Sequence, residues 1–142
     1  MSITNKEIVA GFIEEIWNQK HFNKMGIYLH PEFKDHSLPP SLPPNQEGLK
    51  FWIMGTGKAF ENQTFVDEIV GEDDKVIVKI KMLMKHIGKW RDIEPTGAEV
   101  YAAGYRYFKL IDFKIIEHWA LIDDNAIENH LKEVQKGCKV QV

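Results

Sequence analysis

Apolar residues recur at helical spacing in the first part of the chain and at strand spacing from residue 64 onward. In the first segment they fall three or four positions apart, which places them on one face of a helix. This apolar stripe consists of Ile8, Phe12, Ile13, Ile16 and Trp17. Thr4 and Glu7 have the spacing of a capping box, in which each side chain accepts from the other residue's free backbone amide. The pattern therefore predicts a first helix that begins after Thr4.

Two further helices are predicted ahead of the long strands. A short one begins near Asn23 and ends at Pro31, and it is expected to bury Met25, Tyr28 and Leu29. Residues 39–44 contain four prolines, which fix φ and lack an N–H donor, so they form a rigid loop. Asn45 can cap the third helix. Its inward residues are expected to be Leu49, Trp52, Ile53 and Phe60.

Period-two alternation predicts strands at about 33–36, 64–71, 76–86, 99–110 and 115–122, before a terminal helix that ends near Lys136. In the strand over 76–86, one face carries Val76, Val78, Ile80, Met82, Met84 and His86, and the other carries Lys79, Lys81 and Lys85 with Ile77 and Leu83. Helices followed by an antiparallel meander indicate one α+β domain over residues 1–142. The helices would cover one face of a curved sheet, with a pocket between the two layers.

Composition and charge narrow the function classes. The 142 residues carry a formal net charge of −3 with scattered Lys and Arg, which argues against a nucleic-acid-binding surface. No apolar run approaches the roughly 20 residues that span a bilayer, and the N-terminus lacks the apolar segment of a signal peptide. The single cysteine, Cys138, suits a reducing cytoplasm. We therefore expect a cytoplasmic protein that binds neither nucleic acid nor membrane.

The segment Ile115–Asp124 carries the most chemistry. It has the pattern of an apolar strand that contains an acid, an imidazole and an indole in succession, and it ends in two carboxylates. Asp123 alternates with Trp119 and Leu121, so these three side chains are expected on one side of the sheet and His118 on the other, unless a bulge interrupts the strand. Two interpretations fit Asp123: a proton-transfer group on a pocket wall, or a cap of the terminal helix.

Other positions could take part in such chemistry. His86 continues an apolar strand face, either as a pocket donor or acceptor or as a hydrogen-bonded histidine at the rim of the sheet. Asp35 and His36 lie where a short strand meets the proline loop, as functional or merely solvated residues. One strand face carries three tyrosines, whose hydroxyls could contact a ligand or whose rings could pack in the core. They are Tyr101, Tyr105 and Tyr107.

Several cofactor motifs are missing from the sequence. It contains no HExxH zinc motif, no GxGxxG or phosphate-binding loop and no GxSxG elbow, and one cysteine cannot form a thiolate zinc site. Cofactor-free acid–base chemistry and plain ligand binding are the classes that remain. We therefore expect neither a metal nor an organic cofactor.

Four phrases, in order along the chain, resemble those of the SnoaL-like polyketide cyclases (ester cyclases) of the nuclear transport factor 2-like superfamily. They are Phe12–Gln19, Phe33–His36, His86–Gly88 followed by Pro95–Gly97, and Ile116–Trp119 with Asp123. The resemblance covers nearly the full length. It implies a cone-shaped α+β barrel of the cystatin-like type, with a curved antiparallel sheet packed on three to four helices. It also implies a homodimer through the outer face of the sheet.

In characterised cyclases of this family, an aspartate matching Asp123 acts as acid/base in the ring closure of a polyketide ester, without a cofactor. The resemblance thus implies a cofactor-independent cyclase, isomerase or lyase that uses acid–base catalysis on a small hydrophobic carbonyl compound. The expected catalytic residues are Asp123, His86 and His36. The expected substrate pocket consists of Trp17, Trp52, Met84, Tyr105, Tyr107 and Trp119. The alternative is a non-catalytic protein of the same fold that binds a small ligand.

Overall fold

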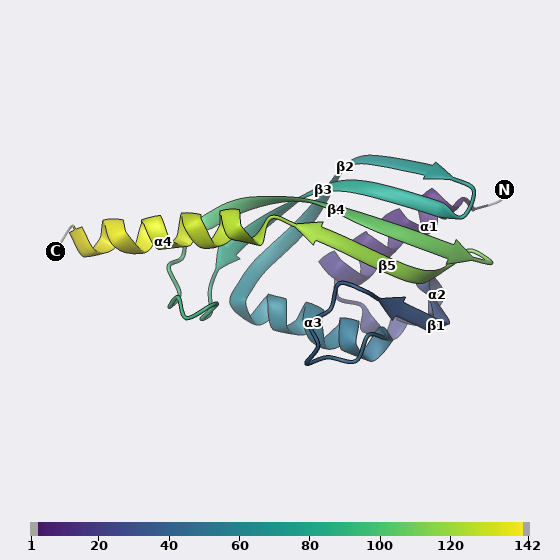
Figure 1. The fold of residues 1–142 in the computed structure, drawn as a ribbon, viewed down its shortest axis with the longest axis horizontal. Coiled ribbons are helices and arrows are strands. Elements are labelled where there is room, and N and C mark those ends of the chain that lie inside the picture. The colour runs from purple at the N-terminus through teal and green to yellow at the C-terminus, as the bar shows by residue number, and fades with distance from the viewer. Residues whose placement is uncertain (1–2, 141–142) are drawn as a thin grey trace.

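Helices cover one face of a five-stranded sheet in the computed structural model of the protein (Figure 1). It describes the backbone of residues 3–140 and the side chains of residues 3–137, so the side chain of Cys138 lies outside it. The helices are α1 (Asn5–Phe12), η1 (Ile13–Asn18), η2 (Phe22–Lys24), α2 (Met25–Tyr28), α3 (Gln46–Ala59) and α4 (Asp124–Val140). The strands are β1 (Leu29–Asp35), β2 (Phe60–Glu72), β3 (Lys75–His86), β4 (Glu99–Ile111) and β5 (Lys114–Ile122). The predicted α+β class is confirmed.

The first helix begins as predicted, because Thr4 Oγ1 accepts a hydrogen bond of 3.2 Å from the backbone N–H of Glu7. After α1 the chain continues as the π-helical turn η1. At the end of η1, Asn18 Oδ1 accepts from the backbone N–H of Thr64 at 2.7 Å, and Asn18 Nδ2 donates to the Thr64 carbonyl at 3.0 Å. These two bonds tie η1 to β2 and hold Trp17, the neighbour of Asn18, against the sheet.

The sheet is mixed and open. Its strands lie in the order β1–β5–β4–β3–β2, and each neighbouring pair is antiparallel except β1 and β5, which are parallel. The expectation of a purely antiparallel sheet is therefore wrong for β1, and the sheet does not close into a barrel. The register of β1 sets Asp35 beside His118 of β5. Pro31 fits its place in β1, because a strand at the edge of a sheet does not use every N–H.

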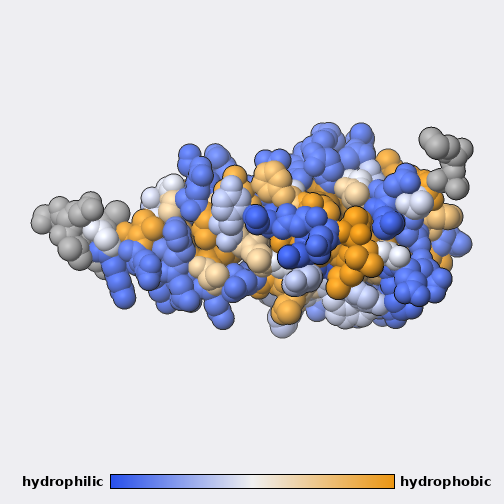
Figure 2. All heavy atoms as spheres, turned by 90° about the horizontal axis from the view of Figure 1, so that it is seen from above, coloured by the Kyte–Doolittle hydropathy of each residue, from blue (hydrophilic) through white to orange (hydrophobic). Residues whose placement is uncertain are grey.

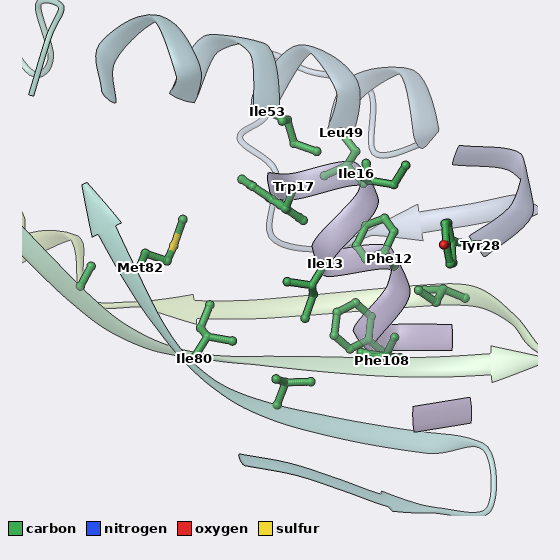
Figure 3. Close-up of a cluster of buried hydrophobic side chains, with 14 of the residues drawn as sticks. Phe12, Ile13, Ile16, Trp17, Tyr28, Leu49, Ile53, Ile80, Met82 and Phe108 are labelled. Carbon is green, nitrogen blue, oxygen red and sulfur yellow. The ribbon is translucent and has the colours of Figure 1, made fainter. Parts of the chain in front are cut away.

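The core lies between the sheet and the N-terminal helices (Figure 3). Alternate residues of β3 and β4 are buried, as the period-two pattern predicts. Phe12 of α1 packs edge-on against Phe108 of β4, with 6.1 Å between the ring centroids, and against Tyr28 at 6.3 Å. Burying each phenylalanine ring stabilises the fold by about 1.5–3 kcal/mol.

The alternation along β5 is interrupted by a bulge. The pairing with β4 includes Ile115 and Glu117 but skips Ile116, which therefore has no partner on that strand. As a result Ile115 and His118, three residues apart, are both buried. A strict period of two cannot describe this strand.

Beyond the bulge, neighbouring residues of β5 lie on opposite sides of the sheet, as the alternation predicts. Each set, however, lies on the side opposite to the one predicted for it. His118 is buried beneath the helices, whereas Trp119 lies on the outer face of the sheet. On β4, Arg106 is buried likewise, and Tyr105 and Tyr107 lie on the outer face. The imidazole of His118 and the guanidinium of Arg106 contact polar partners beneath the helices. Polar side chains therefore occupy inward positions for which the sequence pattern predicts apolar ones.

Helix α4 follows β5 and extends away from the sheet toward the C-terminus (Figure 1). Ile127 and Leu131, in the first half of α4, are buried and fasten this half to the rest of the molecule. No helix within the described part of the chain has both the length and the apolar character that crossing a membrane requires.

Candidate functional site

A cavity of about 320 Å³ lies between the sheet, α3 and the start of α4, a size within the range of small-molecule sites. Aromatic side chains of Trp17, Trp52 and Trp90 contribute to a largely apolar wall. Among the described residues, no three His, Cys, Asp or Glu side chains gather closely enough to hold a metal ion. Of the expected pocket residues, Trp17, Trp52 and Met84 line the cavity, and Tyr105, Tyr107 and Trp119 lie outside it on the outer sheet face.

Three polar side chains from three adjacent strands meet at the floor of this cavity. His118 Nδ1 lies 3.0 Å from Asp35 Oδ2, and His118 Nε2 lies 3.4 Å from Arg106 Nη1. All three residues are buried, and Asp35 and Arg106 border the cavity. Asp35 Oδ1 also accepts from the backbone N–H of Ser37 at 2.9 Å and from its hydroxyl at 2.5 Å. We call this group the Asp35–His118–Arg106 cluster.

The hydrogen bonds determine the charges in the cluster. Arg106 can only donate, so His118 Nε2 is the acceptor and its Nδ1–H donates to Asp35. Burial lowers the pKa of His118 and keeps its ring neutral, although the bond to Asp35 acts in the opposite direction. Burial raises the pKa of Asp35, but hydrogen bonds from His118 and Ser37 outweigh it and hold this pKa below the ordinary value. A neutral imidazole therefore separates a carboxylate from a guanidinium.

The guanidinium of Arg106 is a buried cation without a carboxylate in direct contact. Its Cζ lies 4.4 Å from the centre of the Trp17 ring. Burial lowers its pKa to about 10, so it remains charged at neutral pH. Within residues 3–137 it forms no ion pair, and its Nε is buried without a hydrogen-bond partner. Because an unpaired buried charge is costly, Arg106 is a candidate for binding an oxygen of a ligand.

The two acids after β5 differ in position. Asp123 Oδ1 accepts from the backbone N–H of Ala126 at 3.1 Å, and the residue is exposed, so it caps α4. Asp124 lines the cavity, where burial raises its pKa, and its Oδ2 lies 3.6 Å from Arg91 Nη2. The structure thus brings Asp124, and not Asp123, to the cavity, and a catalytic role of Asp123 stays a prediction.

His86 is buried at the rim of the sheet and is not part of the cavity lining. Its Nδ1 accepts from the backbone N–H of Thr96 at 3.1 Å and lies 3.0 Å from the Thr96 hydroxyl. This geometry corresponds to the hydrogen-bonded interpretation of His86, in which the imidazole anchors the loop between β3 and β4. None of these contacts tests a catalytic role of His86, which stays a prediction.

Replacing Thr96 with valine is expected to destabilise the protein by about 1–2 kcal/mol, because the buried His86 and the backbone N–H of Ala98 each lose a hydrogen bond to the Thr96 hydroxyl without a change in side-chain size. The free energy of unfolding in urea measures the effect. Thr64→Val is the matched control, since the Thr64 hydroxyl is buried without a partner among the described residues. Equal losses in the two variants would contradict the anchoring role of Thr96.

His36 lies on the outside of the sheet. Its ring stacks on Trp119 with 4.5 Å between centroids, and its Nε2 lies 3.5 Å from Glu117 Oε2. The residue is exposed and does not border the cavity. The three expected catalytic residues therefore do not meet at one place, whereas Asp35, the neighbour of His36, belongs to the cavity floor.

The sequence pattern indicates that Arg106 is buried, but the prediction placed its neighbours Tyr105 and Tyr107 in the pocket instead. Arg106 stands at an even position between the apolar residues Ala102 and Phe108, which share its face of β4. A charged residue on an apolar strand face is a sign of a buried, partnered group. No comparable signal identifies Asp124, because adjacent carboxylates before a helix are ordinary capping residues.

Comparisons with known proteins agree with this fold. IdmH from Streptomyces antibioticus matches with a TM-score of 0.82 at 20% identity, covering 92% of this chain and 99% of that one. TsrD from Streptomyces laurentii matches with a TM-score of 0.79 at 19% identity, covering 92% and 97%. A SnoaL-like polyketide cyclase from Agrobacterium tumefaciens matches with a TM-score of 0.77 at 14% identity, covering 92% and 99%.

Identities this low show a shared fold and nothing finer. A search of curated protein sequences finds no match. The family model described as SnoaL-like polyketide cyclase, however, matches residues 7–131, which is most of the chain. The protein therefore belongs to the SnoaL-like polyketide cyclase family.

Proposed function

We propose that the protein is a cofactor-free cyclase, isomerase or lyase that moves one proton on a small hydrophobic carbonyl compound bound in the cavity. The observation that carries this proposal is the buried guanidinium of Arg106, which borders the cavity and forms no ion pair within residues 3–137. Membership of the cyclase family supports the reaction class.

Arg106 would stabilise the charge that develops during the reaction. A carbonyl compound that loses a proton from its α-carbon gains negative charge on its oxygen. A cation fixed in a largely apolar cavity stabilises such charge without having to reorient. His118 and Asp35 act as positioning residues, because their hydrogen bonds hold the guanidinium in place.

Asp124 is the proton-transfer group in this proposal. Burial raises its pKa, which makes its carboxylate a better base than an ordinary aspartate. Asp35 has a lowered pKa, and both of its oxygens already accept hydrogen bonds, so it is the weaker base. Two carboxyl groups with pKa values shifted in opposite directions suit different roles. Asp123, the residue that the family resemblance favours, is the competing candidate.

Exchange of carbon-bound hydrogen in D₂O tests the proposal. β-Tetralone is a two-ring ketone with exchangeable α-hydrogens, and proton NMR follows their replacement by deuterium. The wild-type protein is expected to accelerate this exchange for β-tetralone or another ketone of a one- and two-ring panel, and Asp124→Asn is expected to abolish the acceleration. No acceleration anywhere in the panel would contradict the proposed chemistry. A raised Tm without exchange would instead favour the alternative, a non-catalytic ligand-binding protein.

We also propose a homodimer that forms through the outer face of the sheet. Seen from above the sheet, hydrophobic areas lie between hydrophilic ones (Figure 2). Exposed apolar residues on this face include Phe65, Ile77, Tyr101, Tyr105 and Leu121. A face of this kind is typical of a surface that pairs with another protein.

Light scattering in solution tests the dimer. The wild-type protein is expected at twice the 16.5 kDa mass of the chain, and Tyr105→Glu at the monomer mass. Ile27→Glu is the control, because Ile27 is exposed on α2, away from the outer sheet face. A wild-type monomer would refute this part of the proposal. The cytoplasmic location stays a prediction.

A further inference from the structure

We propose that the cavity binds a keto acid of one or two rings, whose carboxylate lies against Arg106. This inference rests on the proposed function and deepens it by naming an acid, and not a neutral ester, as the class of substrate. It follows from the donors of Arg106 that have no partner, from the charges around it and from the space available.

The guanidinium has unused donors. It carries five N–H groups in a planar fork. Nη1 faces His118 Nε2 at 3.4 Å, Nε is buried without a partner, and Nη2 makes no hydrogen bond to the described residues. Nε has no surface that a ligand can reach, which leaves Nη2 as the donor for a ligand in the cavity. A carboxylate oxygen is the acceptor that a guanidinium donor binds most strongly.

Neither carboxylate of the cavity contacts Arg106 directly. Asp35 is separated from it by the ring of His118, and both Asp35 oxygens accept bonds from His118 and Ser37. Asp124 Oδ2 lies 3.6 Å from Arg91 Nη2, its ion-pair partner. A buried charge without a contacting counter-ion is costly, so an anion at Nη2 gains more than a neutral isostere does.

The remaining wall suits a ring. Trp17 stacks against the guanidinium, and Trp52, Phe60 and Trp90 complete an aromatic boundary around the cavity. The cavity of about 320 Å³ lies at the lower end of the range of small-molecule sites. That space fits one or two rings together with a short acidic side chain.

Benzoylformate is the probe for this inference, because it combines one aromatic ring, a keto group and a carboxylate. It has no α-hydrogen, so it cannot undergo α-proton transfer and its binding is measured alone. Its methyl ester is the neutral counterpart. Titration calorimetry with the wild-type protein is expected to show the acid binding about 10–100-fold more tightly than the ester, the usual effect of a hydrogen-bonded charge pair.

Arg106→Met is expected to abolish this preference for the acid. Lys50→Met is the control, because it removes one positive charge from the exposed side of α3, away from the cavity lining and from the outer sheet face, and is expected to leave the preference unchanged. If Arg106→Met does not fold, Arg106→Lys gives the test: it keeps the charge but loses the planar fork, and the acid is expected to bind about tenfold more weakly.

Three results overturn the inference: no binding of benzoylformate at millimolar concentration, equal binding of acid and ester, or an undiminished preference in the Arg106 variants. Failure of the proposed function has a different signature. In that case no α-hydrogen exchange occurs with any ketone, while the preference for benzoylformate over its ester persists.

Discussion

Replacing Asp124 with asparagine is expected to lower kcat by about 10²–10⁴-fold, the usual contribution of a general acid or base. Asparagine keeps the size of the side chain but cannot accept a proton at its amide. The Asp124 side chain is half exposed at the cavity wall, so the substitution leaves the core packing intact. The loss is therefore expected in turnover and not in the amount of folded protein.

The pH dependence of kcat/KM separates this role from a purely structural one. A general base must be deprotonated to act, so kcat/KM falls as the pH decreases through its pKa. Burial raises the pKa of Asp124, which places this decline above the value of about 3.9 of an unperturbed aspartate. The residual activity of Asp124→Asn is expected to lack the decline. A variant with wild-type kcat and the same pH profile would contradict the role of Asp124.

Replacing Asp35 with asparagine is expected to destabilise the fold by about 3 kcal/mol. The carboxylate accepts His118 Nδ1–H on one oxygen and two donors of Ser37 on the other. Asparagine has a single acceptor oxygen, so its NH₂ group must face a backbone or imidazole donor. The other tautomer of His118 gives no relief, because its Nε2–H would then face Arg106.

Urea unfolding at several pH values measures this effect. The pKa of Asp35 in the folded protein lies below its unfolded value, so ionised Asp35 stabilises the protein above a pH of about 4. That contribution is lost as the pH falls through the folded pKa. The difference between wild type and Asp35→Asn is therefore expected to be largest near neutral pH and to shrink in acid. A difference that does not vary with pH would show that the carboxylate charge is unimportant.

Ser37→Ala is the control for the same site. It removes one donor to Asp35 but leaves the carboxylate, the backbone N–H of residue 37 and the bond to His118. The expected loss is about 1 kcal/mol. A loss as large as that of Asp35→Asn would assign the effect to the loop and not to the buried carboxylate.

The elements with strong periodicity could be predicted from the sequence, because burial on one face dictates which positions are apolar. The stripe of α1 and the alternation of β3 are examples. The pairing of β1 with β5 could not be predicted. β1 is short and contains Pro31, and its parallel partner lies about 80 residues further along the chain, so no local pattern records their contact.

The candidate site was harder to predict, because polar residues carry it. The alternation correctly separated His118 from Trp119, but the predicted inward residue, Trp119, is the one that lies on the outer face. An indole is the more apolar of the two side chains, yet the imidazole is the buried one, because Asp35 and Arg106 supply its hydrogen bonds. Partners on other strands thus override the apolar preference of one position, and a single sequence does not record those partners.

In the proposed reaction, proton transfer belongs to Asp124 in the cavity and not to Asp123 at the helix cap. The decisive measurement compares kcat for Asp123→Asn and Asp124→Asn on one substrate, because asparagine caps a helix as well as aspartate does. We expect near wild-type kcat for Asp123→Asn and a loss of about 10²–10⁴-fold for Asp124→Asn. The reverse order, with activity lost in Asp123→Asn and kept in Asp124→Asn, would contradict this assignment.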